Sequence, residues 1–274
     1  MKARIYLFLE CLFALLGGAL LLLTFTGTIL SPVSSIDTYR TPENPAHYYE
    51  RTLEPQEAYA TFHGTLSRKE ALSDEAPYRL FTLIKDSYVH TSSYRLTIFD
   101  NWLLWLKAHL TPTQLRKELL LDTQLAELLW KRGGGYCHQA VWIFVKHARE
   151  LGFEANFVRL NGHYVGEVKL KDGSWKTVDP DLGIWWDERY DEHKPAFSKE
   201  KVIAALESTG FSKARAEHLS KMYSGEARRG LFYSTPELIE EEYAAERYKW
   251  IIPFAFLVIA LLIHWTRKKL RKGA

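Results

Sequence analysis

GGGYCHQAVWIFVKHARELG, residues 133–152, is the stretch that decides the predicted fold. Its glycine run interrupts the apolar pattern of the preceding residues and would leave room for a substrate backbone to approach. After the glycines, apolar residues recur at helical spacing as far as Leu151, and Gly152 follows where helices commonly stop. The stretch therefore predicts a helix of about four turns over residues 137–151, with Cys137 in its first turn.

Three strand-like runs follow this helix, at residues 155–160, 163–170 and 175–179. Asp172-Gly173, between the last two runs, is a hairpin signal. A three-residue loop with a left-handed Gly173 would set Val165 opposite Asp179. His163 would then be the diagonal neighbour of Asp179 on the same face of the sheet. A two-residue turn would instead put these two side chains on opposite faces.

Cys137 is placed where the glycine-rich loop meets the start of the helix. Backbone N–H groups and the helix dipole stabilise a thiolate at such a position, and the same N–H groups can donate to an oxyanion. A thiolate nucleophile needs a base, and the base needs an orienting acceptor; His163 and Asp179 are the candidates. Each residue also has a structural interpretation, because a lone cysteine at a helix start can be a small buried side chain.

Four short motifs occur in order over residues 133–180, about a sixth of the chain. They are Gly135-x-Cys137-x-x-Ala140, Ala148-Arg149-x-Leu151-Gly152-Phe153-x-Ala155-x-Phe157-Val158, His163-x-x-x-Glu167 and Trp175-x-x-x-Asp179-Pro180. Together they resemble the transglutaminase-like superfamily, relatives of papain-type cysteine proteases. The resemblance implies an α+β fold in which the Cys-bearing helix packs on an antiparallel sheet. It also implies Cys137 as nucleophile, His163 as general base and then acid, and Asp179 as the residue that orients His163.

Two details of the resemblance concern residues around this triad. Some members of the superfamily use an upstream tryptophan as an oxyanion donor, and Trp102, beside Asn101, is the candidate here. The alternative, which we favour, is that Trp102 packs in the core. The superfamily often has an aromatic residue two positions after the histidine, where this chain has Val165.

Two apolar regions at the ends of the chain are typical of membrane-spanning helices. Residues 5–30 carry a single charge, Glu10, and exceed the roughly 20 residues that a bilayer core requires. Residues 250–266 carry no acid, Lys or Arg and have a tryptophan near each end, as an aromatic belt would place them. The alternative for the first region is a cleaved signal peptide, but its apolar stretch is long and lacks an obvious cleavage site, which favours a retained anchor.

Basic residues flank both apolar regions on their terminal sides, so the positive-inside rule places both termini in the cytoplasm. Residues 32–248 would then be periplasmic or extracellular. Within the first span, Glu10 is expected either near the membrane interface, which we favour, or paired with another membrane protein. The flanking residues are Lys2, Arg4, Arg267, Lys268, Lys269, Arg271 and Lys272.

Composition excludes several classes of protein. The chain has 274 residues, with 36 Lys and Arg against 33 Asp and Glu, for a net charge of +3. This small excess argues against a nucleic-acid partner. Two cysteines exclude a disulfide-stapled scaffold and a multi-cysteine zinc site. The histidines lack metal-ligand spacing, so we expect neither a metal ion nor a cofactor.

The sequence therefore predicts four segments: an anchor over 1–31, a proline-rich lead-in and start of the ectodomain over 32–95, a transglutaminase-like domain over 96–235, and a helix over 236–274 that runs into the second anchor and a basic tail. Further helices are expected over 96–110, 113–131, 198–208 and 212–222. The predicted function is a membrane-anchored cysteine hydrolase, a protease or amidase that acts by thioester acyl transfer on a peptide or protein substrate near the membrane. The alternatives are a non-catalytic structural or assembly subunit of a cell-envelope membrane complex and a protein cross-linking acyltransferase.

Overall fold

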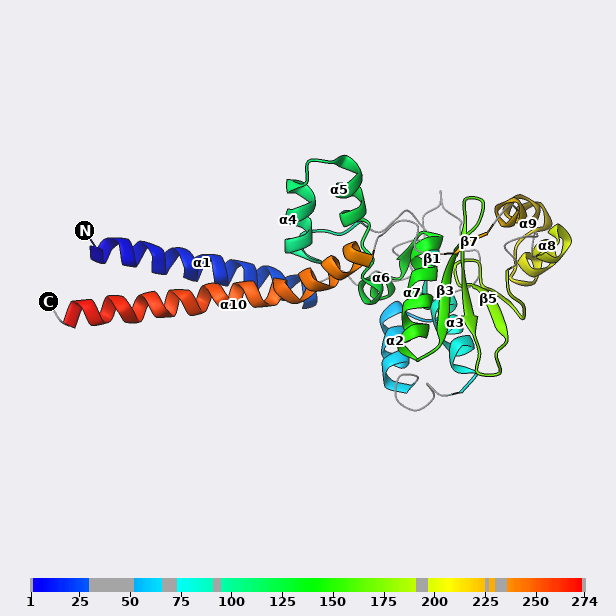
Figure 1. Cartoon of the computed structure of the whole chain (residues 1–274), viewed down its shortest axis with the longest axis horizontal. Coiled ribbons are helices and arrows are strands. Elements are labelled where there is room, and N and C mark those ends of the chain that lie inside the picture. The colour runs from blue at the N-terminus through cyan, green and yellow to red at the C-terminus, as the bar shows by residue number, and fades with distance from the viewer. Residues whose placement is uncertain are drawn as a thin grey trace. The chain divides into compact units, whose positions relative to one another are not determined.

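The computed structural model describes residues 2–29, 52–65, 73–90, 95–190, 197–224, 227–229 and 236–272. It confirms a mixed α+β architecture (Figure 1). The chain divides into two compact units, which we describe separately. The helical unit comprises Met1–Pro32, Arg95–Thr123 and Pro236–Ala274, and the sheet unit comprises Val33–Tyr94 and Gln124–Thr235.

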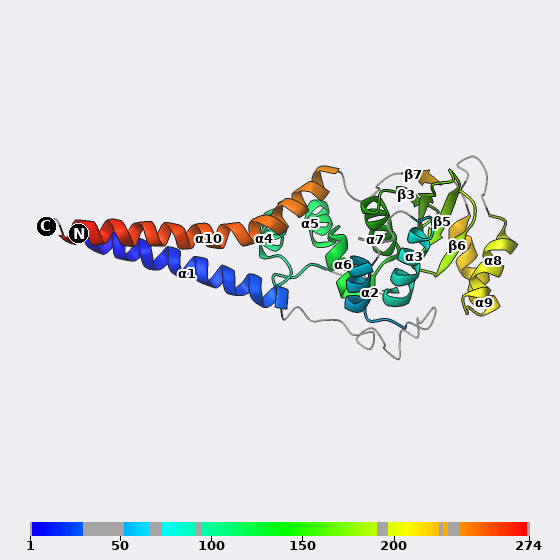
Figure 2. The same cartoon turned by 90° about the horizontal axis from the view of Figure 1, so that it is seen from below.

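Two long helices, α1 (Lys2–Ile29) and α10 (Pro236–Lys272), lie side by side in the helical unit (Figures 1 and 2). Both are long and apolar enough to cross a membrane, over Arg4–Thr28 and Glu237–Arg271. The structure thus confirms a long apolar helix at each end of the chain. It also confirms that the helix beginning at residue 236 continues without a break into the second apolar region.

Glu10, the acidic residue in the first apolar region, is paired with α10 of the same chain. Its carboxylate lies 2.9 Å from Arg267 Nε and 2.9 Å from His264 Nδ1. An acid in an apolar segment is costly unless its charge is matched. The basic end of α10 supplies that match, so Glu10 requires no second membrane protein to neutralise it.

The helices α1 and α10 approach each other closely at Gly17. A Cβ atom at this position would lie 2.9 Å from the Pro253 carbonyl oxygen and 2.9 Å from Leu257 Cγ, whereas a Cβ atom at Gly18 would have no neighbour within 4 Å. Small residues commonly permit such contacts between membrane helices.

A Gly17→Leu substitution is therefore expected to force the two helices apart and to destabilise the helical unit by about 1–3 kcal/mol. Thermal unfolding of the full chain in detergent measures the effect as a fall in Tm. Gly18→Leu is the matched control, because it adds the same side chain one residue away where there is space. Equal Tm values for the two variants would contradict the close contact.

Residues 96–123 lie in the helical unit, although the sequence analysis grouped them with the domain over 96–235. They form α4 (Trp102–Leu110) and α5 (Gln114–Leu121). The helix predicted from residue 96 begins later because Asn101 caps it, accepting a hydrogen bond from the Leu104 N–H at 3.0 Å. Asn101 also donates to Glu246 of α10 at 2.9 Å. The spacing of apolar residues does not reveal such hydrogen bonds between distant segments.

The single helix predicted over 113–131 is wrong, because the chain passes from one unit to the other within it. Helix α5 ends at Leu121 and α6 (Ala126–Arg132) begins after a short break. Thr123 Oγ1 donates to Glu242 of α10 at 3.1 Å, while the Gln124 carbonyl accepts from the Trp142 indole at 2.7 Å. Adjacent residues are thus bound to different units, which interrupts the helix.

The sheet unit contains a five-stranded antiparallel sheet in the order β6-β5-β4-β3-β7. Its three longest strands match the predicted ones to within one residue at each end. A further parallel pairing joins two short strands, β1 and β2, on either side of α6 in the sequence. The strands are β1 (Val89–His90), β2 (Gly134–Gly135), β3 (Glu154–Arg159), β4 (Tyr164–Lys169), β5 (Trp175–Asp179), β6 (Ile184–Trp186) and β7 (Arg228–Arg229).

Further helices of the sheet unit lie before and after the sheet in the sequence. The predicted helices over 198–208 and 212–222 correspond to α8 (Lys199–Ser208) and α9 (Lys213–Ser220), the latter followed by a 3-10 turn, Lys221–Tyr223. In the proline-rich lead-in, Pro55 begins α2 (Pro55–Thr61), and α3 (Ala76–Ser87) follows. Pro32, Pro42 and Pro45 lie outside the described residues.

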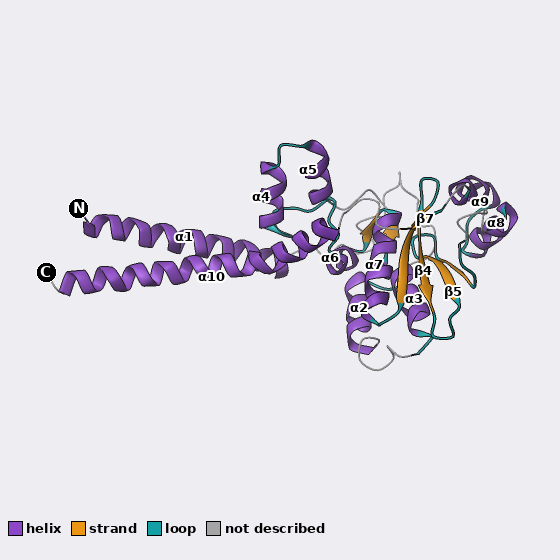
Figure 3. Ribbon diagram, viewed as in Figure 1, coloured by secondary structure: helices purple, strands orange, loops and turns teal. Residues whose placement is uncertain are grey.

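Helix α7 (Cys137–Glu150) ends one residue before the predicted boundary and packs on β3 and β4 (Figure 3). Gly166 of β4 permits this contact, because a Cβ there would lie 3.2 Å from the Phe144 ring and 2.9 Å from Val178. Trp142 and Ile143 are also buried, although they lie off the predicted apolar face, since α3 and α6 cover that side.

A separate apolar cluster holds α8 and α9 against the sheet. Val158 and Val165 contribute from β3 and β4, and Leu206, Leu219 and Tyr223 contribute from the helices and the turn that follows them. Val165 shares a sheet face with His163. The cluster therefore places the end of α9 next to the side of the sheet that carries His163.

Candidate active site

The β4–β5 hairpin has the register that brings His163 and Asp179 together. The Leu170 N–H donates to the Ser174 carbonyl at 2.8 Å, and the three residues between them form the loop, with Gly173 at φ +85°. Gly166 pairs with Val178, a register that continues to Val165 opposite Asp179. Of the two turns that the sequence left open, the structure has the three-residue turn, which puts the two side chains on the same face.

His163 and Asp179 form a buried hydrogen-bonded pair. The distance from His163 Nε2 to Asp179 Oδ2 is 2.6 Å, and the two residues are 2% and 0% exposed. Asp179 Oδ1 accepts hydrogen bonds from the backbone N–H groups of Asp181 at 3.1 Å and Leu182 at 2.9 Å. These donors fix the orientation of the carboxylate toward the imidazole.

Tyr223 completes the surroundings of Asp179, and no sequence pattern predicted this role. Its hydroxyl donates to Asp179 Oδ2, and its ring centroid lies 5.2 Å from that of His163. Burial and the Asp179 carboxylate raise the pKa of Tyr223 well above its ordinary value of 10.0, so the hydroxyl remains a donor. A contact across 44 residues of sequence depends on the packing of α9, which no local pattern reveals.

Cys137 is the first residue of α7 and is partly buried. The glycines before it serve the fold, contrary to the expectation that they leave room for substrate. Gly133 ends α6 in the left-handed conformation (φ +68°), with its N–H bonded to carbonyls of that helix. A Cβ at Gly135 would lie 2.1 Å from Gln139 Oε1 and 2.3 Å from the Tyr88 hydroxyl. These side chains occupy the space.

The thiol and the imidazole lie close together. Cys137 Sγ, a ring nitrogen of His163 and a carboxylate oxygen of Asp181 all lie within 4.8 Å of one another. Burial lowers the pKa of His163, but the Asp179 carboxylate and the hydrogen-bonded Cys137 outweigh burial, so this pKa lies well above its ordinary value of 6.5. Because Asp179 engages Nε2, Nδ1 is the nitrogen that remains for the thiol. His163 therefore holds its proton more firmly than an ordinary histidine does, next to the Cys137 sulfur.

A second histidine–aspartate pair adjoins the first and was missed in the sequence. His90 Nδ1 lies 2.8 Å and 3.0 Å from the two carboxylate oxygens of Asp181, which is 1% exposed. Burial lowers the pKa of His90, but the Asp181 carboxylate raises it by more, and the net shift is upward. The β1–β2 pairing sets His90 beside Gly135, two residues before Cys137.

Trp102, the predicted oxyanion candidate, is in the helical unit. Its indole N–H lies 3.1 Å from Thr24 Oγ1 and 3.3 Å from the Lys249 carbonyl, and the residue is buried there. This is the packing role that the sequence analysis favoured.

Three residues predicted from the sequence, Cys137, His163 and Asp179, are thus brought together, and Asp181, His90 and Tyr223 join them. Cysteine, histidine and aspartate are donor types that also occur in zinc sites. That no metal ion binds stays a prediction, since it rested on sequence spacing alone.

Comparison with known proteins gives this chain no family. No protein-family model matches the sequence, and a search of the curated proteins finds no similar chain. Its function must therefore be argued from the geometry of these residues.

Proposed function

We propose that the sheet unit is a transglutaminase-like cysteine hydrolase, a protease or amidase. The observation that carries the proposal is the buried 2.6 Å contact between His163 and Asp179, with the Cys137 sulfur within 4.8 Å of a ring nitrogen of the same imidazole. A nucleophile, a base and an orienting carboxylate in contact are the parts that thioester acyl transfer requires. The papain-like fold implied by the sequence motifs agrees with a Cys-bearing helix packed on an antiparallel sheet.

The chemistry would proceed in two steps. The Cys137 thiolate attacks the amide carbonyl, and the imidazolium of His163 gives its proton to the departing amine as the C–N bond breaks, which leaves a thioester. His163 then takes a proton from water, the hydroxide attacks the thioester carbonyl, and the C–S bond breaks to release the acid and the thiolate. Asp179 holds the ring in one orientation throughout and stabilises its charged form.

Transfer to an amine is the second candidate reaction, and Asp181 is the observation that favours it. A buried carboxylate within 4.8 Å of the sulfur could accept an N–H from an amine that approaches the thioester. Incorporation of a fluorescent primary amine into a glutamine-containing peptide, lost in Cys137→Ala, would identify a transferase. Release of ammonia without incorporation would identify a hydrolase.

We also propose that α1 and α10 are retained membrane anchors, with both termini cytoplasmic and the sheet unit periplasmic or extracellular. The length and apolar character of both helices support insertion, and the basic residues at the chain ends support the orientation. A peptide or protein substrate held near the membrane surface fits a domain tethered in this way.

Alkylation of Cys137 separates an enzyme from a structural subunit. Because Asp179 keeps His163 charged, we expect iodoacetamide to label Cys137 in the full chain faster than free cysteine at pH 7, and to go on doing so down to about pH 5–6. Mass spectrometry of the Cys137 peptide gives the rate at each pH. In His163→Gln the rate should fall with pH as for an ordinary thiol. Labelling no faster than free cysteine would support the non-catalytic alternative.

A further inference from the structure

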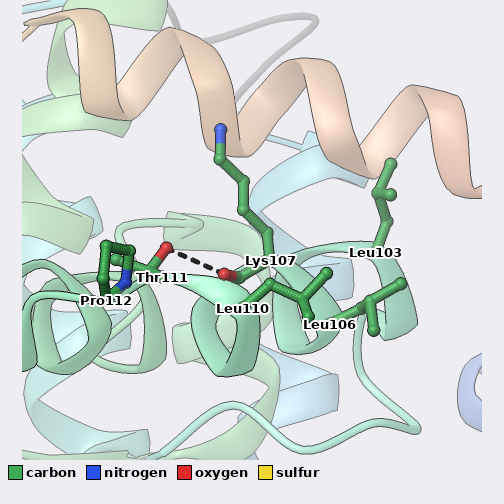
Figure 4. Close-up of a pocket in the computed structure, with 6 residues that line it drawn as sticks. All are labelled: Leu103, Leu106, Lys107, Leu110, Thr111 and Pro112. Carbon is green, nitrogen blue, oxygen red and sulfur yellow. Dashed lines mark hydrogen bonds between the residues drawn. The ribbon is translucent and has the colours of Figure 1, made fainter.

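The helix pair α4–α5 carries exposed apolar side chains that its own unit leaves uncovered. Leu106, Leu110 and Leu115 are 42%, 74% and 74% exposed. Figure 4 shows Leu106 and Leu110 next to each other on α4, along an open hollow of about 390 Å³. The hollow is lined by Leu103, Leu106, Lys107, Leu110, Thr111 and Pro112.

Few polar groups reach this hollow. The Thr111 hydroxyl donates to the Lys107 carbonyl at 2.8 Å, which satisfies it within the helix (Figure 4). The Lys107 ammonium is paired with Glu241 of α10, and Arg116 lies 3.2 Å from the same carboxylate. The charged groups are therefore matched among themselves, and the leucines form an apolar surface that water solvates poorly.

The helix α4 begins at the level where the two apolar spans end. The Trp102 indole bonds Thr24 of α1 and the carbonyl of Lys249, the residue just before the second apolar stretch. A Cβ at Gly27 would lie 1.5 Å from the Phe99 carbonyl oxygen, so the chain leading into α4 rests directly on the last turns of α1. Any bilayer that these spans cross must end close to α4.

We propose that the apolar face of α4, together with Leu115 of α5, lies in the lipid interface of the bilayer that α1 and α10 cross. Leucines on one side, a partly buried tryptophan at position 105, and Lys107 and His109 in the last turn are typical of the composition of interfacial helices. We infer that lipid covers this apolar face, because the face of α4 is continuous with the ends of the apolar spans in α1 and α10. The inference rests on the proposed insertion of those spans.

Fluorescence quenching by brominated lipids tests the inference. The full chain with Cys11→Ser and Cys137→Ser receives one new cysteine and a bimane label at Leu110→Cys, at Leu15→Cys on the exposed side of α1, or at Lys171→Cys in an exposed loop of the sheet unit. Each is reconstituted into vesicles of equal parts phosphatidylcholine and phosphatidylglycerol, with or without bromine on the acyl chains. An interfacial helix buries its apolar face about 5–10 Å deep, within reach of such quenchers.

We expect the label at position 110 to lose fluorescence to nearly the same extent as the label at 15, while the label at 171 loses none. Quenching at 15 but not at 110 would overturn the lipid contact and leave the anchors standing. Absence of quenching at 15 would overturn both insertion and this inference. Excimer emission from pyrene at position 110, without quenching by brominated lipid, would show that a second copy covers the face, and would also overturn it.

Discussion

Cys137→Ser is expected to lose essentially all turnover of fluorescein-labelled casein and peptide p-nitroanilides, with kcat lower than that of the unmodified chain by about 10⁴-fold or more. This is the largest effect that we expect. A hydroxyl in place of the thiol is barely ionised at neutral pH, and the imidazolium of His163 cannot hold it as an alkoxide. The serine is nearly isosteric, so the fold should be unchanged.

Cys11→Ser is the matched control for this experiment, because it removes the other thiol of the chain from α1. It should retain full activity and full labelling of Cys137. Turnover by Cys137→Ser at the rate of the unmodified chain would contradict the proposed nucleophile. Equal loss in both cysteine variants would point to a general requirement for thiols rather than to the site.

Asp179→Asn is expected to lower kcat/KM by about 10²–10⁴-fold and to change its pH dependence. The carboxylate raises the pKa of His163, so the imidazolium persists above the ordinary value of 6.5 and loses its proton only as the pH approaches the raised value. Without that charge the ring loses its proton at lower pH. The alkaline limb of the kcat/KM profile should therefore shift to lower pH. The amide would also donate to Nε2 and place the ring proton on Nδ1, facing the sulfur.

The measurement is kcat/KM and the rate of Cys137 alkylation across pH. Asp172→Asn is the matched control, since Asp172 lies exposed in the loop of the same hairpin and bonds only locally, to the Ser174 N–H at 2.8 Å. It should leave both profiles unchanged. Identical profiles for Asp179→Asn and the unmodified chain would contradict the role of Asp179 as the residue that orients and charges His163.

The parts of the site that the sequence predicted are those governed by local geometry. Asp172-Gly173 predicted a hairpin, and of the two turn lengths that the sequence left open the structure has the three-residue one, which sets Val165 opposite Asp179. Helical spacing after the glycines was enough to place Cys137 at a helix start. Both rules act over a few residues, so no knowledge of the remaining chain was needed.

The parts that the sequence missed depend on contacts between distant segments. His90 reaches Asp181 only because β1 pairs with β2, 45 positions further along the chain, and Tyr223 reaches Asp179 only through the packing of α9. The glycine run was misread for the same reason, because the neighbours of Gly135 include Tyr88 from a distant part of the chain. Glu10 likewise finds its partners on the last helix, 254 residues away for His264.

The hydroxyl that secures Asp179 belongs to residue 223, near the end of the sheet unit. Protein synthesis proceeds from the N-terminus, so a nascent chain displays the cysteine, the histidine and the aspartate well before that tyrosine is made. Until α9 and the turn after it have emerged and docked, the carboxylate lacks one of its donors and the imidazole lacks its aromatic neighbour. The cluster of Cys137, His163 and Asp179 is thus completed late, when nearly the whole sheet unit has been made.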